Sequence, residues 1–105
     1  MSAGLHGGNI KSMGVLSITV DLDSVSTNTS GETTVTVPGL QVGDFVAVNK
    51  PSLEAGIVVG TCRVSAANTL AIQVINTTGG SVNEASETFI VFWARPEGVV
   101  SAAND

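Results

Sequence analysis

The sequence has few of the residues that carry metal-dependent or nucleophilic chemistry. Among its 105 residues there is one cysteine, one histidine and no tyrosine, and aromatic residues make up 4% of the chain. A single cysteine, Cys62, excludes a disulfide framework. A structural zinc site takes four cysteine or histidine ligands, whereas this chain offers two candidates in total. We therefore expect no metal, no cofactor and no catalytic residue, and we predict that the protein is not an enzyme.

Charged residues are also scarce. They make up 12% of the chain, about half the usual share of a globular domain. The net charge is −5, and the four basic residues are scattered along the sequence. Nucleic acids and anionic membranes are bound by clustered cations, so both partners are disfavoured. A surface with few charges is cheap to desolvate, which predicts that part of it is covered by protein.

Long apolar runs are missing as well. No run approaches the ~20 residues that span a bilayer. The first residues lack the basic start and apolar stretch of a secretory signal. Together with the lone cysteine, this predicts that the protein folds in a reducing cytoplasm.

The single histidine and the single cysteine have no visible catalytic partner. His6 stands beside Gly7 and Gly8, where nothing would fix its tautomer. Cys62 stands in an apolar run, where a free cysteine usually packs as a small hydrophobe. Its neighbour Arg63 is expected to point to the opposite side of the strand. We interpret the histidine as solvated and the cysteine as packed.

Two acidic pairs are weak candidates for a site. Asp21 and Asp23 would share one strand face, but the spacing lacks the glycine and distal glutamate of an EF-hand loop. Glu84 and Glu87 suggest the paired carboxylates of a glycosidase, but they stand in a polar segment with nothing to desolvate them. We interpret both pairs as solvated charges.

Alternating apolar and polar residues predict a series of short β-strands. No stretch has the 3.6-residue period of a long helix, and turn-forming residues separate strand-sized runs. The alternation is clearest in Leu16–Leu22, Thr33–Val37 and Leu70–Val74. Roughly six to eight such strands predict an all-β fold, a small antiparallel β-sandwich or barrel of jelly-roll-like form.

The last apolar run differs from this alternation. Residues 89–94 are apolar on both faces, which predicts a central strand or one whose outer face is covered by a neighbouring subunit. Phe89, Val91 and Trp93 are therefore assigned to the core or to a subunit interface. Trp93 is not expected to bind sugar, because the chain has little else on which a sugar ring could stack.

Two further positions carry backbone predictions. The run Ile57–Val64 is predicted to be a buried strand, in which Gly60 marks a bulge or a close approach. Asn68 stands in a tight connection and is expected to adopt the left-handed conformation.

The two ends lack periodicity. We predict a flexible Gly-rich arm at residues 1–14, a β-sandwich domain at residues 15–96 and a C-terminal tail at residues 97–105. Apolar residues in such ends suggest docking onto a partner, since alone they have little to bury against. The predicted partner or capsid contacts are Leu5, His6, Ile10, Val99 and Val100.

One long run has the style of a known class of proteins. Residues 33–96 include TTVTVPGLQVGDFVAVNKPSLEAGIVVGTCRVSAANTLAIQVINTTGGSV and close with ETFIVFWARPE. The TVTVPG strand and turn, the VGDFVAV run, the loop ending in AGIVVG and the final apolar strand resemble small β-sandwich virion proteins of tailed bacteriophages. The resemblance is greatest to capsid decoration, or cement, proteins. It carries no site residues.

The resemblance implies a structural role. Decoration proteins of this class commonly form trimers on the outside of the shell and brace neighbouring capsomers. A homotrimer that binds the major capsid protein at the capsid surface is therefore expected, made in the bacterial host cytoplasm. No nucleic acid, membrane or small-molecule substrate is expected as a partner. Related patterns occur in tail and fibre proteins, so the alternative is a tail- or fibre-associated phage β module with a binding role.

Overall fold

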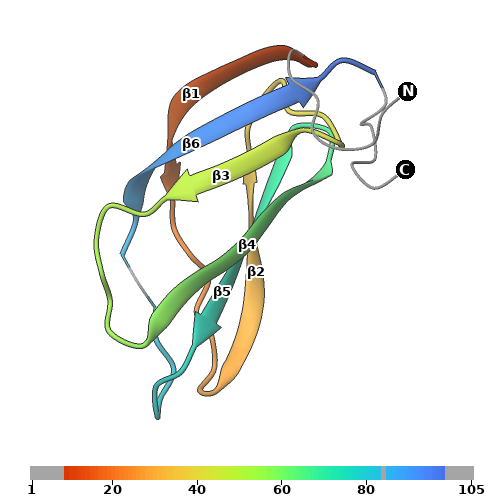
Figure 1. Cartoon of the computed structure of the whole chain (residues 1–105). Helices are drawn as coiled ribbons and strands as arrows, with labels where there is room; N and C mark the ends of the chain where they lie inside the picture. The colour runs from red at the N-terminus through yellow and green to blue at the C-terminus, as the bar shows by residue number, and fades with distance from the viewer. Residues whose placement is uncertain (1–8, 84, 99–105) are drawn as a thin grey trace.

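The structure is a computed structural model that describes residues 9–83 and 85–98. This part of the chain folds into two three-stranded antiparallel sheets packed together as a small β-sandwich (Figure 1). Sheet I has the strand order β1-β6-β3 and sheet II the order β2-β5-β4. The all-β sandwich expected from the sequence is thus confirmed. The strands are β1 (Ile10–Val20), β2 (Thr29–Thr36), β3 (Phe45–Asn49), β4 (Ile57–Ala66), β5 (Thr69–Asn76) and β6 (Glu87–Pro96).

The core lies between the two central strands, β5 and β6. Leu70 and Ile72 of β5 and Phe89 and Val91 of β6 are fully buried. Each of these strands is flanked on both sides by antiparallel neighbours, so its inward side chains are shielded from all directions. The prediction that the last apolar run forms a central strand is confirmed. The other core side chains come from every strand and from the loops between them: Val20, Leu22, Val25, Val37, Leu40, Val46, Ile57, Val64 and Val74.

The structure corrects two predicted boundaries. Strand β1 begins at Ile10, so residues 10–14, predicted as arm, belong to the sandwich, because they pair with residues 93–96 of β6. Strand β2 begins at Thr29, four residues before the alternation of Thr33–Val37 that predicted it, because its polar start pairs with Val74–Asn76 of β5. Pairing by backbone groups tolerates glycine and polar side chains, which hide a strand from hydrophobic periodicity.

Strand β4 is an edge strand, not the buried strand that its apolar composition suggested. It has one neighbour, β5, and its side chains alternate between the core and the surface. The predicted irregularity at Gly60 is confirmed, since the register shifts between Val59 and Cys62. The Gln73 side chain occupies the space where a Cβ of Gly60 would sit, and its Oε1 accepts a hydrogen bond of 3.3 Å from the Thr61 amide.

Asn68 closes the turn between β4 and β5. Its φ of 62° is left-handed, as predicted, and its Oδ1 accepts a hydrogen bond of 2.8 Å from the Gly39 amide. Its own amide donates to the Leu40 carbonyl oxygen at 2.8 Å. The turn is thereby joined to the loop that leads into β3.

Asn76 at the end of β5 fixes the opposite end of the sandwich. It is fully buried, and its Nδ2 donates to the carbonyl oxygens of Val25 at 2.8 Å and of Gly80 at 2.9 Å. Its Oδ1 accepts from the amide of Thr78 at 2.8 Å and from the hydroxyl of the same residue at 2.7 Å. A buried amide is stable only when its donors and acceptors have partners. One side chain therefore joins the loop that follows β5 to the loop that contains Val25, which precedes Asn76 by 51 residues in sequence.

Replacing this amide is expected to destabilise the whole domain. Asn76→Ala removes four hydrogen bonds of a fully buried side chain and leaves the Thr78 amide without its partner, and we expect a loss of about 3 kcal/mol in the free energy of unfolding. Urea denaturation followed by circular dichroism measures it. Asn83→Ala, at an exposed position nearby, is the matched control and should unfold at the wild-type urea concentration. Equal stability of Asn76→Ala and the control would show that the amide network is not a structural anchor.

Candidate functional site

The outward side chains of β6 form the centre of an apolar surface. Successive residues of a strand point to opposite faces, and Phe89 and Val91 point into the core. Ile90, Phe92 and Ala94 must therefore point outward. Ile90 is 43% exposed even though it lies in the central strand of its sheet.

Both neighbouring strands continue this surface. Across sheet I, the backbone register aligns the outward residues in three rows: Met13–Ala94–Phe45, Val15–Phe92–Ala47 and Ser17–Ile90–Asn49. Met13, Val15 and Phe45 are between 57% and 67% exposed. The rings of Phe45 and Phe92 meet edge to face with centroids 6.4 Å apart. We call these nine residues the outer face of sheet I.

The outer face of sheet I is apolar and free of charge. Seven of its nine residues are apolar, and the two polar ones, Ser17 and Asn49, share its last row. The exposed apolar side chains present on the order of 500 Å², near the upper end of what a monomer usually shows, and such patches are often functional. This face is the strongest candidate functional site in the described part of the chain.

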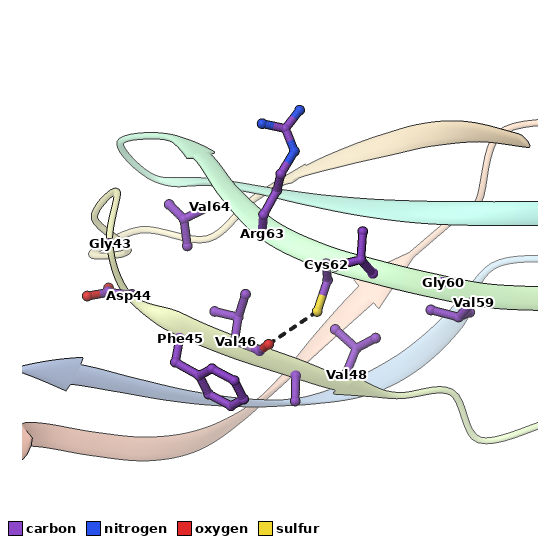
Figure 2. Close-up of a pocket in the computed structure, with 12 residues that line it drawn as sticks. Gly43, Asp44, Phe45, Val46, Val48, Val59, Gly60, Cys62, Arg63 and Val64 are labelled. Atoms are coloured by element: carbon purple, nitrogen blue, oxygen red, sulfur yellow. Dashed lines mark hydrogen bonds between the residues drawn. The ribbon is translucent and has the colours of Figure 1, made fainter. Parts of the chain in front are cut away.

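The outer face of sheet II has the opposite character. Arg63 of β4 and Glu32 of β2 form a bidentate pair, with N–O distances of 3.0 and 3.1 Å. Arg63 is aligned with the fully buried Ala71 of the central strand β5 and Glu32 with Gln73 of the same strand, so the pair reaches diagonally across β5. Arg63 points away from β3, as Figure 2 shows. The guanidinium of Arg63 lowers the pKa of the Glu32 carboxyl through their hydrogen bonds. Sheet II thus presents a solvated polar face.

The charged residues of β6 stand near its two ends, on the side of the strand that faces the core. Glu87 at the start pairs with Lys50 at 2.8 Å. Arg95 near the end forms a bidentate pair with Asp44, at 2.8 and 2.9 Å, and its Nη2 donates to the Gly39 carbonyl oxygen at 2.8 Å. Glu87 therefore lies in the strand and in an ion pair, which corrects its interpretation as a solvated loop charge.

The Asp44 carboxylate is held in its charged form. Its side chain is 2% exposed. The hydrogen bonds from Arg95 hold its pKa below the ordinary value, against the opposing effect of burial. The Arg95 guanidinium also lies 5.4 Å from the centre of the Trp93 ring. Trp93 in turn packs over Gly14, where a Cβ atom would come within 2.9 Å of the indole Nε1.

An open groove of about 540 Å³ lies between β3 and β4, the adjacent edges of the two sheets (Figure 2). Val46 and Val48 point toward β4, whereas Phe45 points to the other side of β3. The Cys62 Sγ atom lies 3.3 Å from the Val46 carbonyl oxygen. Burial raises the pKa of the Cys62 thiol, which disfavours the reactive thiolate. The thiol that lines the groove is thus poorly suited to act as a nucleophile.

The structure places only some of the predicted site residues. Phe89 and Val91 lie in the core of the single chain, and Trp93 is half-buried against it. Ile10 is exposed at the start of β1, beyond the Met13 row. The other predicted contacts, Leu5, His6, Val99 and Val100, lie outside the described residues.

The acidic candidates are not brought together. Asp21 and Asp23 follow the end of β1, and Asp23 donates its amide to the Thr33 hydroxyl at 2.8 Å. Glu84 lies outside the described residues. Within residues 9–83 and 85–98, no three histidine, cysteine, aspartate or glutamate side chains are grouped to hold a metal ion. Nor does this part contain a helix long and apolar enough to cross a membrane.

Sequence reasoning found β6 but missed its neighbours on the outer face. The Met-Gly-Val-Leu run of residues 13–16 is apolar on both sides of the strand, as residues 89–94 are, and that signal could have identified Met13 and Val15. Phe45 carried no comparable signal, because its place beside Ala94 depends on the pairing of β3 with β6.

Comparison of the chain with protein-family models, with curated proteins and with solved structures gives no match.

The buried ion pair at Asp44 predicts a specific response to acid. Because the folded-state pKa lies below the ordinary value of 3.8, the pair stabilises the fold above about pH 4 and is lost as the pH falls through the lowered pKa. Asp44→Asn should therefore melt several degrees below wild type at pH 7, and the gap should narrow below pH 4. Thermal melts across this range test it. Glu32→Gln, which breaks an exposed pair, should melt close to wild type at pH 7.

Proposed function

We propose that the protein is a structural virion protein, a capsid decoration or cement protein that binds the outer capsid surface and stabilises contacts between capsomers. The observation that supports this most is the charge-free outer face of sheet I, opposite a polar face on sheet II. A folded domain with one large apolar face is built to be covered by protein.

The segments that carry the sequence resemblance also build this face. The run VGDFVAV supplies Phe45 and Ala47, and the run ETFIVFWARPE supplies Ile90, Phe92 and Ala94. Six of the nine residues of the outer face thus lie within the run that resembles virion proteins, where a subunit or capsid contact would use them.

Assembly explains how so small a protein could brace a shell. In a homotrimer, three copies would bind together, so weak contacts to the major capsid protein would combine into tight attachment. The expected location is the capsid surface of the virion, after synthesis in the cytoplasm of the bacterial host. The bond network at Asp44 and Asn76 would keep each copy rigid, so that little ordering entropy opposes docking.

Copy number in purified virions tests the proposal. Quantitative mass spectrometry against the major capsid protein should give hundreds of copies in a fixed ratio to the capsid subunit. A few to a dozen copies would instead support the alternative, a tail- or fibre-associated module with a binding role. Absence from virions would refute both.

The N-terminal residues are proposed as part of the capsid contact, through Leu5 and His6. Since β1 begins at Ile10, deleting residues 2–8 spares every described strand. We expect this variant to fold and assemble as wild type but to occupy stripped capsids less fully, as measured by gel densitometry after sedimentation. Replacing residues 2–8 by a Gly-Ser segment of equal length controls for chain length and should bind as weakly. Full occupancy by the deleted chain would show that these residues are not a tether.

A further inference from the structure

We infer that the outer face of sheet I packs against a second copy of this chain, as the interface between subunits. The inference deepens the proposed function, on which it rests only in requiring that the chain assembles. It assigns the apolar face to self-association and leaves the polar surfaces for the capsid.

The chemistry of the face favours a permanent partner. Interfaces between subunits of an obligate oligomer resemble a domain core cut in half, whereas contacts between proteins that fold separately are more polar. The centre of this face consists of Phe92, Ala94 and Ile90, flanked by Val15 and Phe45. Such a composition belongs to the interior of a protein.

Charge also favours a second copy over a different partner. The chain has a net charge of −5, so two copies repel one another at most surfaces. The rows of the outer face contain no charged side chain, and the exposed Lys11 stands at the start of β1, at the register shift that precedes the Met13 row. Two such faces can therefore meet without placing like charges in contact.

The alternation of large and small side chains on the outer face of sheet I suits packing of one sheet on another. In two adjacent rows a small residue stands beside large ones: Ala94 between Met13 and Phe45, and Ala47 next to Phe92. Ala94 is 6% exposed, so it lies at the bottom of a hollow between its neighbours. Sheets that pack face to face stand about 10 Å apart with interdigitated side chains, which requires such alternation of large and small residues.

The size of the face is adequate for a stable interface. A standard interface buries about 800 Å² on each partner. The apolar rows provide on the order of 500 Å². The polar row of Ser17 and Asn49, with the exposed Thr19–Thr88 pair beyond it, extends the same surface as a rim. An apolar centre with a polar rim is the usual anatomy of a protein interface.

The mass of the purified full-length chain in solution tests the inference. Light scattering after size-exclusion chromatography should give a multiple of 10.6 kDa for the wild type. Val15→Lys places a charge in the apolar centre and should weaken association by at least about 100-fold, giving monomers. Val58→Lys is the matched control, because Val58 is an exposed valine on an edge strand of sheet II, and it should keep the wild-type mass.

A second variant guards against misfolding. Ala47→Lys alters the same face from a different strand, and circular dichroism verifies the fold of each variant. Folded variants that keep the wild-type mass would overturn the inference. So would equal dissociation by Val58→Lys, or a wild type that stays monomeric at about 100 µM.

The result of the mass measurement can be distinguished from the result of the copy-number measurement in virions. Monomers in solution together with hundreds of copies per virion would refute the inference while supporting the proposed function, and would assign the face to the capsid. Oligomers that dissociate on Val15→Lys, without copies in virions, would support the inference and refute the proposed function.

Discussion

The alternation of β6 is the constraint on which the rest of the structure depends. This strand is the centre of sheet I, and its inward residues Phe89 and Val91 are fully buried against the other sheet. Because successive side chains of a strand point to opposite faces, the burial of this row also fixes the direction of the residues between. Ile90, Phe92 and Ala94 must face outward, although each is apolar. If β6 shifted by one residue, the row Ile90–Phe92–Ala94 would face the core in place of Phe89 and Val91, and both rows are apolar. Hydrophobicity alone therefore does not decide which row faces the core.

The charged ends of the inward row set the register of β6. Glu87 and Arg95 share the parity of Phe89 and Val91 and pair with Lys50 and Asp44. A slip by one residue would turn both charges to the outer face and leave Asp44, whose side chain is 2% exposed, without its partner. An unpaired buried carboxylate is costly, whereas the ion pair itself is weak evidence for stability. The ion pairs therefore act mainly on specificity: they select one of two apolar faces as the interior.

Most of the fold could be predicted from the sequence, because hydrophobic alternation and turn residues are local signals. The break in strand register at Gly60 and the left-handed conformation of Asn68 could be predicted from the residue types alone. Strand β4 was placed wrongly in the interior, since composition does not reveal whether a strand has one neighbour or two. For the candidate site the sequence indicated the central strand, but the residues named there, Phe89, Val91 and Trp93, point inward. The remaining members of the site depend on which residues of β1 and β3 lie beside β6, and pairing register is a property of the folded chain.

A chain of this size cannot bury all of its apolar residues, and the sandwich deals with the excess by concentrating it. A domain of about 100 residues buries roughly 60–65% of its unfolded surface. If the apolar residues that remain exposed were spread evenly over the surface, they would stand singly, and single exposed apolar residues are common and carry no function. Here sheet II is mostly polar outside, with the Glu32–Arg63 pair across it, whereas four of the eight large exposed apolar side chains in the described residues lie together on the outer face of sheet I. Concentration of this kind promotes aggregation in an isolated domain. It is therefore a cost that only a covered face would justify, which is why the asymmetry of the two faces argues for assembly more strongly than composition does.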